Sequence, residues 1–298
     1  MPQSILSNWV QSDVETLITP KSPKPDKQAK VLFRQGSELW NQGQYAEAIA
    51  AYDQAVQLQP DYVEAWYYRG FGLEELRHYE QALASYDEVI RLDPLHQYVW
   101  CRRGIVLLTR LQRYDEAFAS YNKVIEIEPN NYEAWYGRGD ALIELKRYPE
   151  AVTSYKEAIH INPTNCFDWC ERVQKLQELK LEQQALSLCK ELATDLEKMA
   201  AQVAEEYYLV WDSIHQNWCM LGACLLGLKC YTEAVSACDK AIQIKQDEIL
   251  DWYCRGNALE ELQRYKEAAN CYDKVIQIQP NFEEATKGRE RVLRKVKK

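Results

Sequence analysis

Several features that mark an enzyme are missing from this sequence. Its four histidines lie far apart along 298 residues, at His78, His96, His160 and His215. The patterns HExxH, GxSxG and GxxxxGKS/T, which carry metalloprotease, hydrolase and nucleotide chemistry, do not occur. We therefore expect no enzyme, no catalytic residue and no cofactor.

Long apolar runs and a strong positive charge are also absent. No stretch reaches the roughly 18 apolar residues of a membrane-spanning helix, and the N-terminus lacks the basic and apolar segments of a signal peptide. The formal net charge of −9 disfavours binding to a phosphate backbone. We expect a soluble, cytoplasmic protein with no transmembrane segment and no nucleic-acid partner.

The ten cysteines do not form a metal-binding pattern. Cys166 and Cys170 lie one helical turn apart, but no CxxC pair or neighbouring histidine completes a zinc site. Cys189 and Cys238 stand where comparable segments have tyrosine. We expect reduced, packed or half-exposed thiols and no metal, with a redox or metal role as the alternative.

The sequence does contain a regular tryptophan spacing. Intervals of 34, 35, 34, 49 and 34 residues separate Trp66, Trp100, Trp135, Trp169, Trp218 and Trp252. With the tryptophan at position 4 of each unit, position 8 holds Gly36, Gly70, Gly104, Gly139, Gly222 and Gly256. Alanine recurs at position 20, and proline closes five units. A repeat of this length predicts a stack of two-helix units.

Each recurring residue has a physical reason. A glycine inside a helix costs about 1 kcal/mol relative to alanine, so its recurrence indicates that a neighbouring helix comes close. The position-20 alanine is expected to supply the matching small contact. Proline ends the second helix because it lacks the N–H that a helix interior needs. Each unit is thus predicted to hold two amphipathic helices, A and B, joined by a short turn.

From about residue 29 to residue 282, this pattern resembles the tetratricopeptide repeat. The resemblance implies an all-α, right-handed superhelical solenoid of about seven helix pairs. The tryptophan, tyrosine, arginine and glycine pattern of helix A resembles that of bacterial, including cyanobacterial, members. One departure is arginine where the family has leucine before the glycine: Arg69, Arg103, Arg138, Arg172 and Arg255. We predict three ion pairs across unit boundaries: Arg69–Asp53, Arg103–Asp87 and Arg255–Asp239.

Three regions follow from this reading. Residues 1–28 are predicted to form an amphipathic helix and a Pro/Lys linker, 29–282 the solenoid, and 283–298 a basic capping helix. The solenoid units are 29–62, 63–96, 97–131, 132–165, 166–214, 215–248 and 249–282. The apolar face of residues 4–18 would pack on the first unit, bind a partner or, less favoured by its acids, contact a membrane. The last helix would be the polar cap that a solenoid needs.

The fifth unit is divergent and carries 15 extra residues. Its helix B is expected to continue, and two capping-box patterns could start the next helix: Thr194-x-x-Glu197 and Ser213-x-x-Gln216. We favour the second, because it places the break directly before the sixth unit. The long helical pair would be either a tolerated insertion or a partner-docking lobe with Tyr207, Tyr208 and Trp211 at its tip.

The resemblance also implies which residues face a partner. Positions 2, 5, 6, 9, 12 and 13 of helix A would line a concave groove, where the sequence places ten acids against three bases, Lys30, Arg34 and Arg102. The predicted partner-binding residues are Glu64, Tyr67, Tyr68, Phe71, Glu74, Glu75, Tyr98, Arg102, Glu133, Tyr136, Asp140, Glu144, Phe167, Glu171, Tyr253, Asn257 and Glu260. Acids in a concave lining attract cations, and aromatic rings add contact area.

This groove favours one class of ligand. Chaperone-adaptor members of the family grip a terminal carboxylate with basic and amide side chains, and of the matching positions here only Arg102 fits. We therefore predict a non-catalytic scaffold or assembly factor that binds a basic, partly apolar peptide or helix. The alternative is a weakly self-associating structural protein whose basic tail or linker occupies a neighbour's groove. RNA binding is disfavoured by the acids.

Overall fold

The computed structural model describes residues 26–203 and 207–296, and all regular structure in these residues is α-helical. The predicted all-α fold is confirmed. Seven helical hairpins and one further helix follow one another along this part of the chain. The predicted amphipathic helix at residues 4–18 lies outside the described residues. Contacts divide the chain into two compact units, 1–129 and 130–298.

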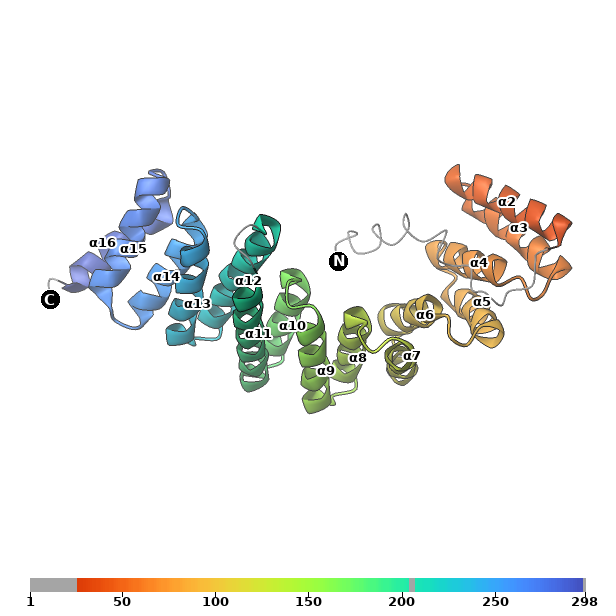
Figure 1. Cartoon of the computed structure of the whole chain (residues 1–298), viewed down its shortest axis with the longest axis horizontal. Coiled ribbons are helices and arrows are strands. Elements are labelled where there is room, and N and C mark those ends of the chain that lie inside the picture. Colours follow the sequence, from red (N-terminus) through yellow and green to blue (C-terminus); the bar gives the residue numbers. More distant parts are fainter. Residues whose placement is uncertain (1–25, 204–206, 297–298) are drawn as a thin grey trace. The chain divides into compact units, whose positions relative to one another are not determined.

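The first unit holds three hairpins whose helices have 13 to 15 residues (Figure 1). They are α2 (Lys27–Asn41) with α3 (Tyr45–Leu58), α4 (Val63–Glu75) with α5 (Tyr79–Leu92), and α6 (Gln97–Thr109) with α7 (Tyr114–Ile127). The Asp26 carboxylate caps α2 by accepting a hydrogen bond from the Gln28 N–H at 2.8 Å. The three hairpins of the first unit thus have nearly the same helix lengths.

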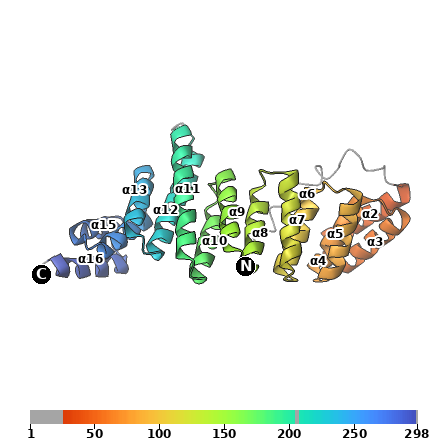
Figure 2. The ribbon, with the colours of Figure 1, turned by 90° about the horizontal axis from the view of Figure 1, so that it is seen from below.

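The second unit holds four hairpins and a terminal helix. They are α8 (Tyr132–Glu144) with α9 (Tyr148–Ile161), α10 (Cys166–Glu178) with α11 (Glu182–Gln202), α12 (Tyr208–Gly227) with α13 (Tyr231–Ile244), α14 (Ile249–Glu261) with α15 (Tyr265–Ile278), and α16 (Glu283–Val296). Helices α11 and α12 have 21 and 20 residues. Figure 2 shows α11 extending past its neighbours.

The turn between helices A and B contains one residue in a left-handed conformation in every hairpin, and the turn of the third hairpin is one residue longer than the others. That residue is a glycine only at Gly43, with φ of 77°. The other hairpins use Arg77, Gln112, Lys146, Lys180, Lys229 and Gln263. This conformation lets the next N–H reach back to helix A, as in the 2.8 Å bond from His78 N–H to the Leu73 carbonyl. The turn is held by backbone geometry rather than by glycine.

A buried tyrosine on helix B accounts for the recurring glycine. A Cβ built on Gly70 would lie 2.7 Å from Cε1 of Tyr86, which is fully buried. The same relation holds for Gly36 with Tyr52, Gly104 with Tyr121, Gly139 with Tyr155, and Gly256 with Tyr272. The predicted close approach is confirmed, but the residue facing the glycine is this ring and not the position-20 alanine. That alanine is buried as well.

The predicted helix break at Ser213 is wrong. Helix α11 ends at Gln202 and α12 begins at Tyr208, so Ser213 lies inside α12 and Thr194 inside α11. The Ser213 hydroxyl donates to the Thr164 carbonyl at 3.4 Å instead of capping a helix. The serine of the favoured capping pattern therefore contacts the neighbouring repeat and does not begin a helix.

Candidate functional site

The arginines before the glycine connect neighbouring repeats. The Nε of Arg103 lies 2.8 Å from Asp87 Oδ1, and that of Arg255 lies 2.6 Å from Asp239 Oδ1. Arg69 pairs with Asp53 in the same way. All three predicted ion pairs are confirmed.

The same guanidinium groups also reach helix B of their own hairpin. Arg103 donates to the Ser120 hydroxyl at 2.8 Å, and Arg69 donates to the Ser85 hydroxyl at 2.6 Å. Each of these arginines has a second bonding partner inside the stack, and Arg103 is only 16% exposed. Their role is to tie helices together, so they are poor candidates for contacting a partner.

In the first unit, the predicted groove acid Glu74 is turned inward. It accepts a hydrogen bond from the Tyr86 hydroxyl at 2.8 Å, and its side chain is 10% exposed. Arg102 lies 3.5 Å from Glu74 and stacks 4.5 Å from the centre of the Phe71 ring. Burial, and then the Glu74 charge, raise the pKa of Tyr86. This acid, base and ring stabilise one another.

Aromatic rings around these groups form a connected set. Tyr67 contacts Tyr68 at 5.3 Å and stacks on His96 at 6.0 Å, and His96 contacts Tyr98 at 6.4 Å. Tyr67, Tyr68, Tyr98 and the predicted Glu64 are all half-buried. Glu75 is exposed. The structure thus brings most of the predicted first-unit residues together as a packed surface, from which Glu75 projects.

In the second unit, a base on the next helix A pairs with each of two groove acids. Asp140 accepts from Arg172 Nη2 at 2.7 Å and from the Tyr155 hydroxyl at 2.8 Å. Glu144 pairs with Lys175 at 2.8 Å. Neither base was among the predicted groove residues, because Arg172 and Lys175 stand at positions 7 and 10 of their helix. The strongly acidic groove lining that was predicted is therefore partly neutralised.

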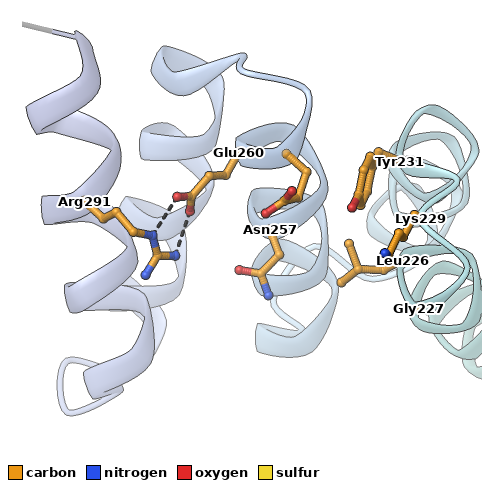
Figure 3. A pocket seen from close by; sticks show the side chains of 8 residues that line it. Leu226, Gly227, Lys229, Tyr231, Asn257, Glu260 and Arg291 are labelled. Carbon is orange, nitrogen blue, oxygen red and sulfur yellow. Dashed lines mark hydrogen bonds and ion pairs between the residues drawn. The ribbon is translucent and has the colours of Figure 1, made fainter. Parts of the chain in front are cut away.

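A hollow of about 310 Å³ lies where α12, α13, α14 and α16 meet. Its lining residues are Leu226, Gly227, Lys229, Tyr231, Asn257, Glu260, Glu261 and Arg291. Figure 3 shows the Arg291 side chain directed at the Glu260 carboxylate, and two hydrogen bonds of 2.6 and 2.7 Å join them. The Tyr272 hydroxyl lies within hydrogen-bond distance of both Asn257 Oδ1, at 2.9 Å, and the Glu260 carboxylate, at 3.0 Å. Only 8% of Glu260 is exposed.

The sequence identified Asn257 and Glu260 but missed Arg291 and Tyr231. Helix α16 was interpreted only as a basic cap, yet it follows the repeat register. Arg289 pairs with Asp273, sixteen residues earlier, as Arg255 does with Asp239. That spacing would have placed Arg291 at groove position 9, next to the seventh repeat.

The predicted residues of α10 remain open to solvent. The side chain of Glu171 is 70% exposed, and Phe167, one helical turn earlier, is 76% exposed. By contrast, Tyr136 is buried, Tyr253 packs against Phe282 at 5.1 Å, and Glu133 is half-buried. The α10 residues are therefore the more accessible part of the predicted groove.

The tip of the long helical pair presents further apolar residues. Tyr207, Tyr208 and Leu209 are 61%, 67% and 82% exposed, whereas Trp211 is half-buried. A larger hollow of about 810 Å³, lined in part by Tyr208, Trp211 and Lys240, opens beside α12 and α13. The sequence predicted Tyr207, Tyr208 and Trp211 at the tip, but neither the exposure of Leu209 nor this hollow.

The described part of the chain has neither a metal-binding cluster nor a membrane-spanning helix. No cluster of three or more histidine, cysteine or acidic side chains there could hold a metal ion. Among residues 26–203 and 207–296, no helix combines the length and apolar character needed to cross a membrane.

Family models match six stretches of the chain. A model described as "TPR repeat" matches residues 36–76 and 106–145. Models described as "Tetratricopeptide repeat" match residues 63–96, 132–165, 215–248 and 251–282. Together these matches cover more than half of the chain.

Solved structures show the same fold at low sequence identity. MamA 41-end from Desulfovibrio magneticus RS-1 is 19% identical, with a TM-score of 0.50 over 60% of this chain and 99% of that one. A tetratricopeptide repeat protein from Parabacteroides merdae is 15% identical, with a TM-score of 0.50 over 90% of this chain and 100% of that one. No curated protein sequence matches the chain. The repeats support a protein–protein interaction scaffold, and the chain belongs to the tetratricopeptide repeat family.

Proposed function

We propose that the chain is a non-catalytic scaffold or assembly factor that binds a basic, partly apolar peptide or helix along the groove face of its second unit. The observation that carries this proposal is the exposure of Phe167 and Glu171, one turn apart on α10. A ring beside a carboxylate suits a cationic side chain with an apolar stem, which stacks on the ring and pairs with the acid. The exposed Glu178 continues this row.

The internal ion pairs give the groove acids two roles. Asp140 pairs with Arg172, and Glu260 pairs with Arg291. These two acids connect neighbouring helices and so stabilise the arrangement of the surface. Glu171 lies 3.4 Å from the guanidinium group of the adjacent Arg172, but its side chain is 70% exposed. Glu178 is exposed as well, so both acids can be reached by a ligand. A surface that is already ordered loses little conformational entropy on binding. Specificity then depends on the outward acids and on Phe167.

The test is a charge reversal on α10. A synthetic amphipathic helical peptide of lysine, alanine and leucine serves as the probe, and fluorescence anisotropy at low and high salt measures its binding to the full chain. The double variant Glu171→Lys with Glu178→Lys should lose affinity about tenfold or more at low salt. The salt dependence of binding should also flatten.

Glu157 provides a matched control for that experiment. It is exposed on helix B of the fourth repeat, so Glu157→Lys makes the same charge change on α9, outside the proposed row, as Glu171→Lys alone makes on α10. This variant should bind the probe as the wild type does, apart from a small general effect of net charge. If both sets of variants bind equally well, α10 is not the binding surface.

The alternative is self-association through the basic tail. Arg291 and Lys295 already lie within ion-pair distance of Glu260 in their own chain, which leaves fewer tail bases for a neighbour. A monomeric mass by sedimentation at both low and high salt would eliminate this alternative.

The cysteines all lie in described residues and are free thiols, and we place the protein in the cytoplasm on that basis.

A further inference from the structure

Nine of the ten cysteines lie in the second unit, between residues 166 and 271. Cys189 and Cys238 occupy the buried helix B site that holds tyrosine in the other repeats. A Cβ built on Gly222 would lie 2.8 Å from Cys238 Sγ, just as other repeat glycines face a tyrosine ring. The small thiol group leaves room that neighbouring cysteines share.

Two of these thiols touch. Cys170 Sγ on α10 lies 3.4 Å from Cys224 Sγ on α12, and both residues are half-buried. A disulfide needs the sulfurs about 2.05 Å apart, so they must approach by about 1.4 Å. Cys170 is half-buried rather than fully buried, so part of its surface is accessible to a small reagent.

We propose that Cys170 and Cys224 are a site of reversible oxidation, which forms a disulfide between α10 and α12 when the protein meets a low-molecular-weight disulfide such as oxidised glutathione. The Cys170 thiolate attacks one sulfur of the reagent, forms a mixed disulfide and releases one small thiol. The Cys224 thiolate then attacks Cys170 Sγ and releases the second small thiol. Two protein thiols are oxidised, one reagent disulfide is reduced, and the two protein protons end on the released thiols.

The surroundings of the pair support this order of attack. A hydrogen bond from Cys224 lowers the pKa of Cys170, and the same bond, followed by burial, raises the pKa of Cys224. Burial raises the pKa of Cys189 to about 12, which keeps that thiol protonated. The thiolate is the reactive form of cysteine. Cys170 is therefore expected to react with the reagent before Cys224 and before its buried neighbour Cys189.

The new bond would join the first helices of two successive hairpins across the lengthened α11. It would close a loop of more than fifty residues that includes the whole of α11 and most of α12. Closing a long loop restricts the unfolded chain and so stabilises the folded one. Oxidation would therefore stiffen the most divergent hairpins of the protein and replace the Cys170 thiol by a disulfide.

The experiment treats the full chain with oxidised glutathione and follows it by mass spectrometry. Cleavage after lysine and arginine should give one linked species that contains residues 157–172 and 199–229, and fragment sequencing should place the link between Cys170 and Cys224 rather than at Cys166 or Cys219. The oxidised chain should melt about 5–10 °C higher than the reduced one. Dithiothreitol should reverse both changes.

Two cysteine variants complete the test. Cys224→Ser should abolish the link and the melting shift. Cys101→Ser, which changes the repeat position of Cys170 but in the first unit, should preserve both. Circular dichroism of the reduced variants checks that each is folded. The proposal is overturned if the folded wild type keeps all its thiols or stops at a glutathione adduct on Cys170. It is also overturned if the Cys224→Ser chain forms links as well as the wild type does.

Discussion

The two units fill the same repeat positions with different chemistry. In the first unit, Phe33 packs against Tyr52, Tyr62 and Tyr68 with ring centroids 5.3 to 5.6 Å apart. In the second unit, Cys189 and Cys238 stand at the buried tyrosine site of the fifth and sixth repeats. One unit is thus held by large rings, and a stretch of the other by small thiols.

This difference accompanies other departures from the repeat. Where Cys189 replaces tyrosine, Val173 replaces the glycine that would face it, because a side chain now fits. The same stretch has the two longest helices, and Trp169 there is buried and bonds to Asn217 Oδ1 at 2.8 Å. A repeat can lose its ring when several neighbouring residues change together. The regular hairpins preserve the fold, and the divergent ones carry its variation.

The largest effect should come from removing a ring. Replacing Tyr86 by cysteine imitates the second unit without its compensating changes, and it leaves a cavity beneath Gly70. We expect a loss of about 3–4 kcal/mol in the free energy of unfolding, measured in urea. The matched change Cys238→Ala should cost only about 1 kcal/mol, because far less volume is removed. Equal losses would mean that ring and thiol sites contribute alike.

A smaller effect should follow from cutting an arginine link. Arg103→Met retains the apolar stem but loses the bonds to Asp87 and Ser120, and it should cost about 1–2 kcal/mol in the same unfolding measurement. The control Arg147→Met removes an exposed ion pair with Glu150 within one hairpin. That pair should contribute well under 1 kcal/mol. A similar loss for both would show that connecting two repeats brings no extra stability.

The smallest effect should be the part of the pH dependence of stability that comes from His96 in the first unit. Burial lowers the pKa of His96 in the folded chain, although Asp93 opposes that shift. The unfolded chain therefore binds a proton more readily, and stability is lost as pH falls below about 6.5, toward the lower folded pKa. His96→Gln should weaken this dependence in melting curves between pH 7.5 and 5.5. The exposed His78→Gln should leave it unchanged, and a dependence untouched by His96→Gln would contradict the assignment.

The sequence predicted contacts best where one register repeats. The Arg103–Asp87 and Arg255–Asp239 pairs follow from a fixed spacing of sixteen residues, so they could be named in advance. The inward turn of Glu74 could not be named, because it depends on Tyr86 and Arg102, which come from two other helices. Ser213 was misassigned for a similar reason, since a capping pattern says nothing about the Thr164 carbonyl across the repeat.

The sequence by itself determined the helical hairpins and their repetition, and the extent of the regular repeats, because spacing and amphipathic pattern are local properties of the chain. Only the tertiary structure decided which groove acids remain available. Glu260 and Glu171 are both predicted groove residues on a helix A. Glu260 is buried and paired with Arg291, whereas Glu171 faces water. The contact between Cys170 and Cys224 is likewise a tertiary result. These outcomes depend on which side chain of the next helix reaches each residue, and that is settled by packing in three dimensions.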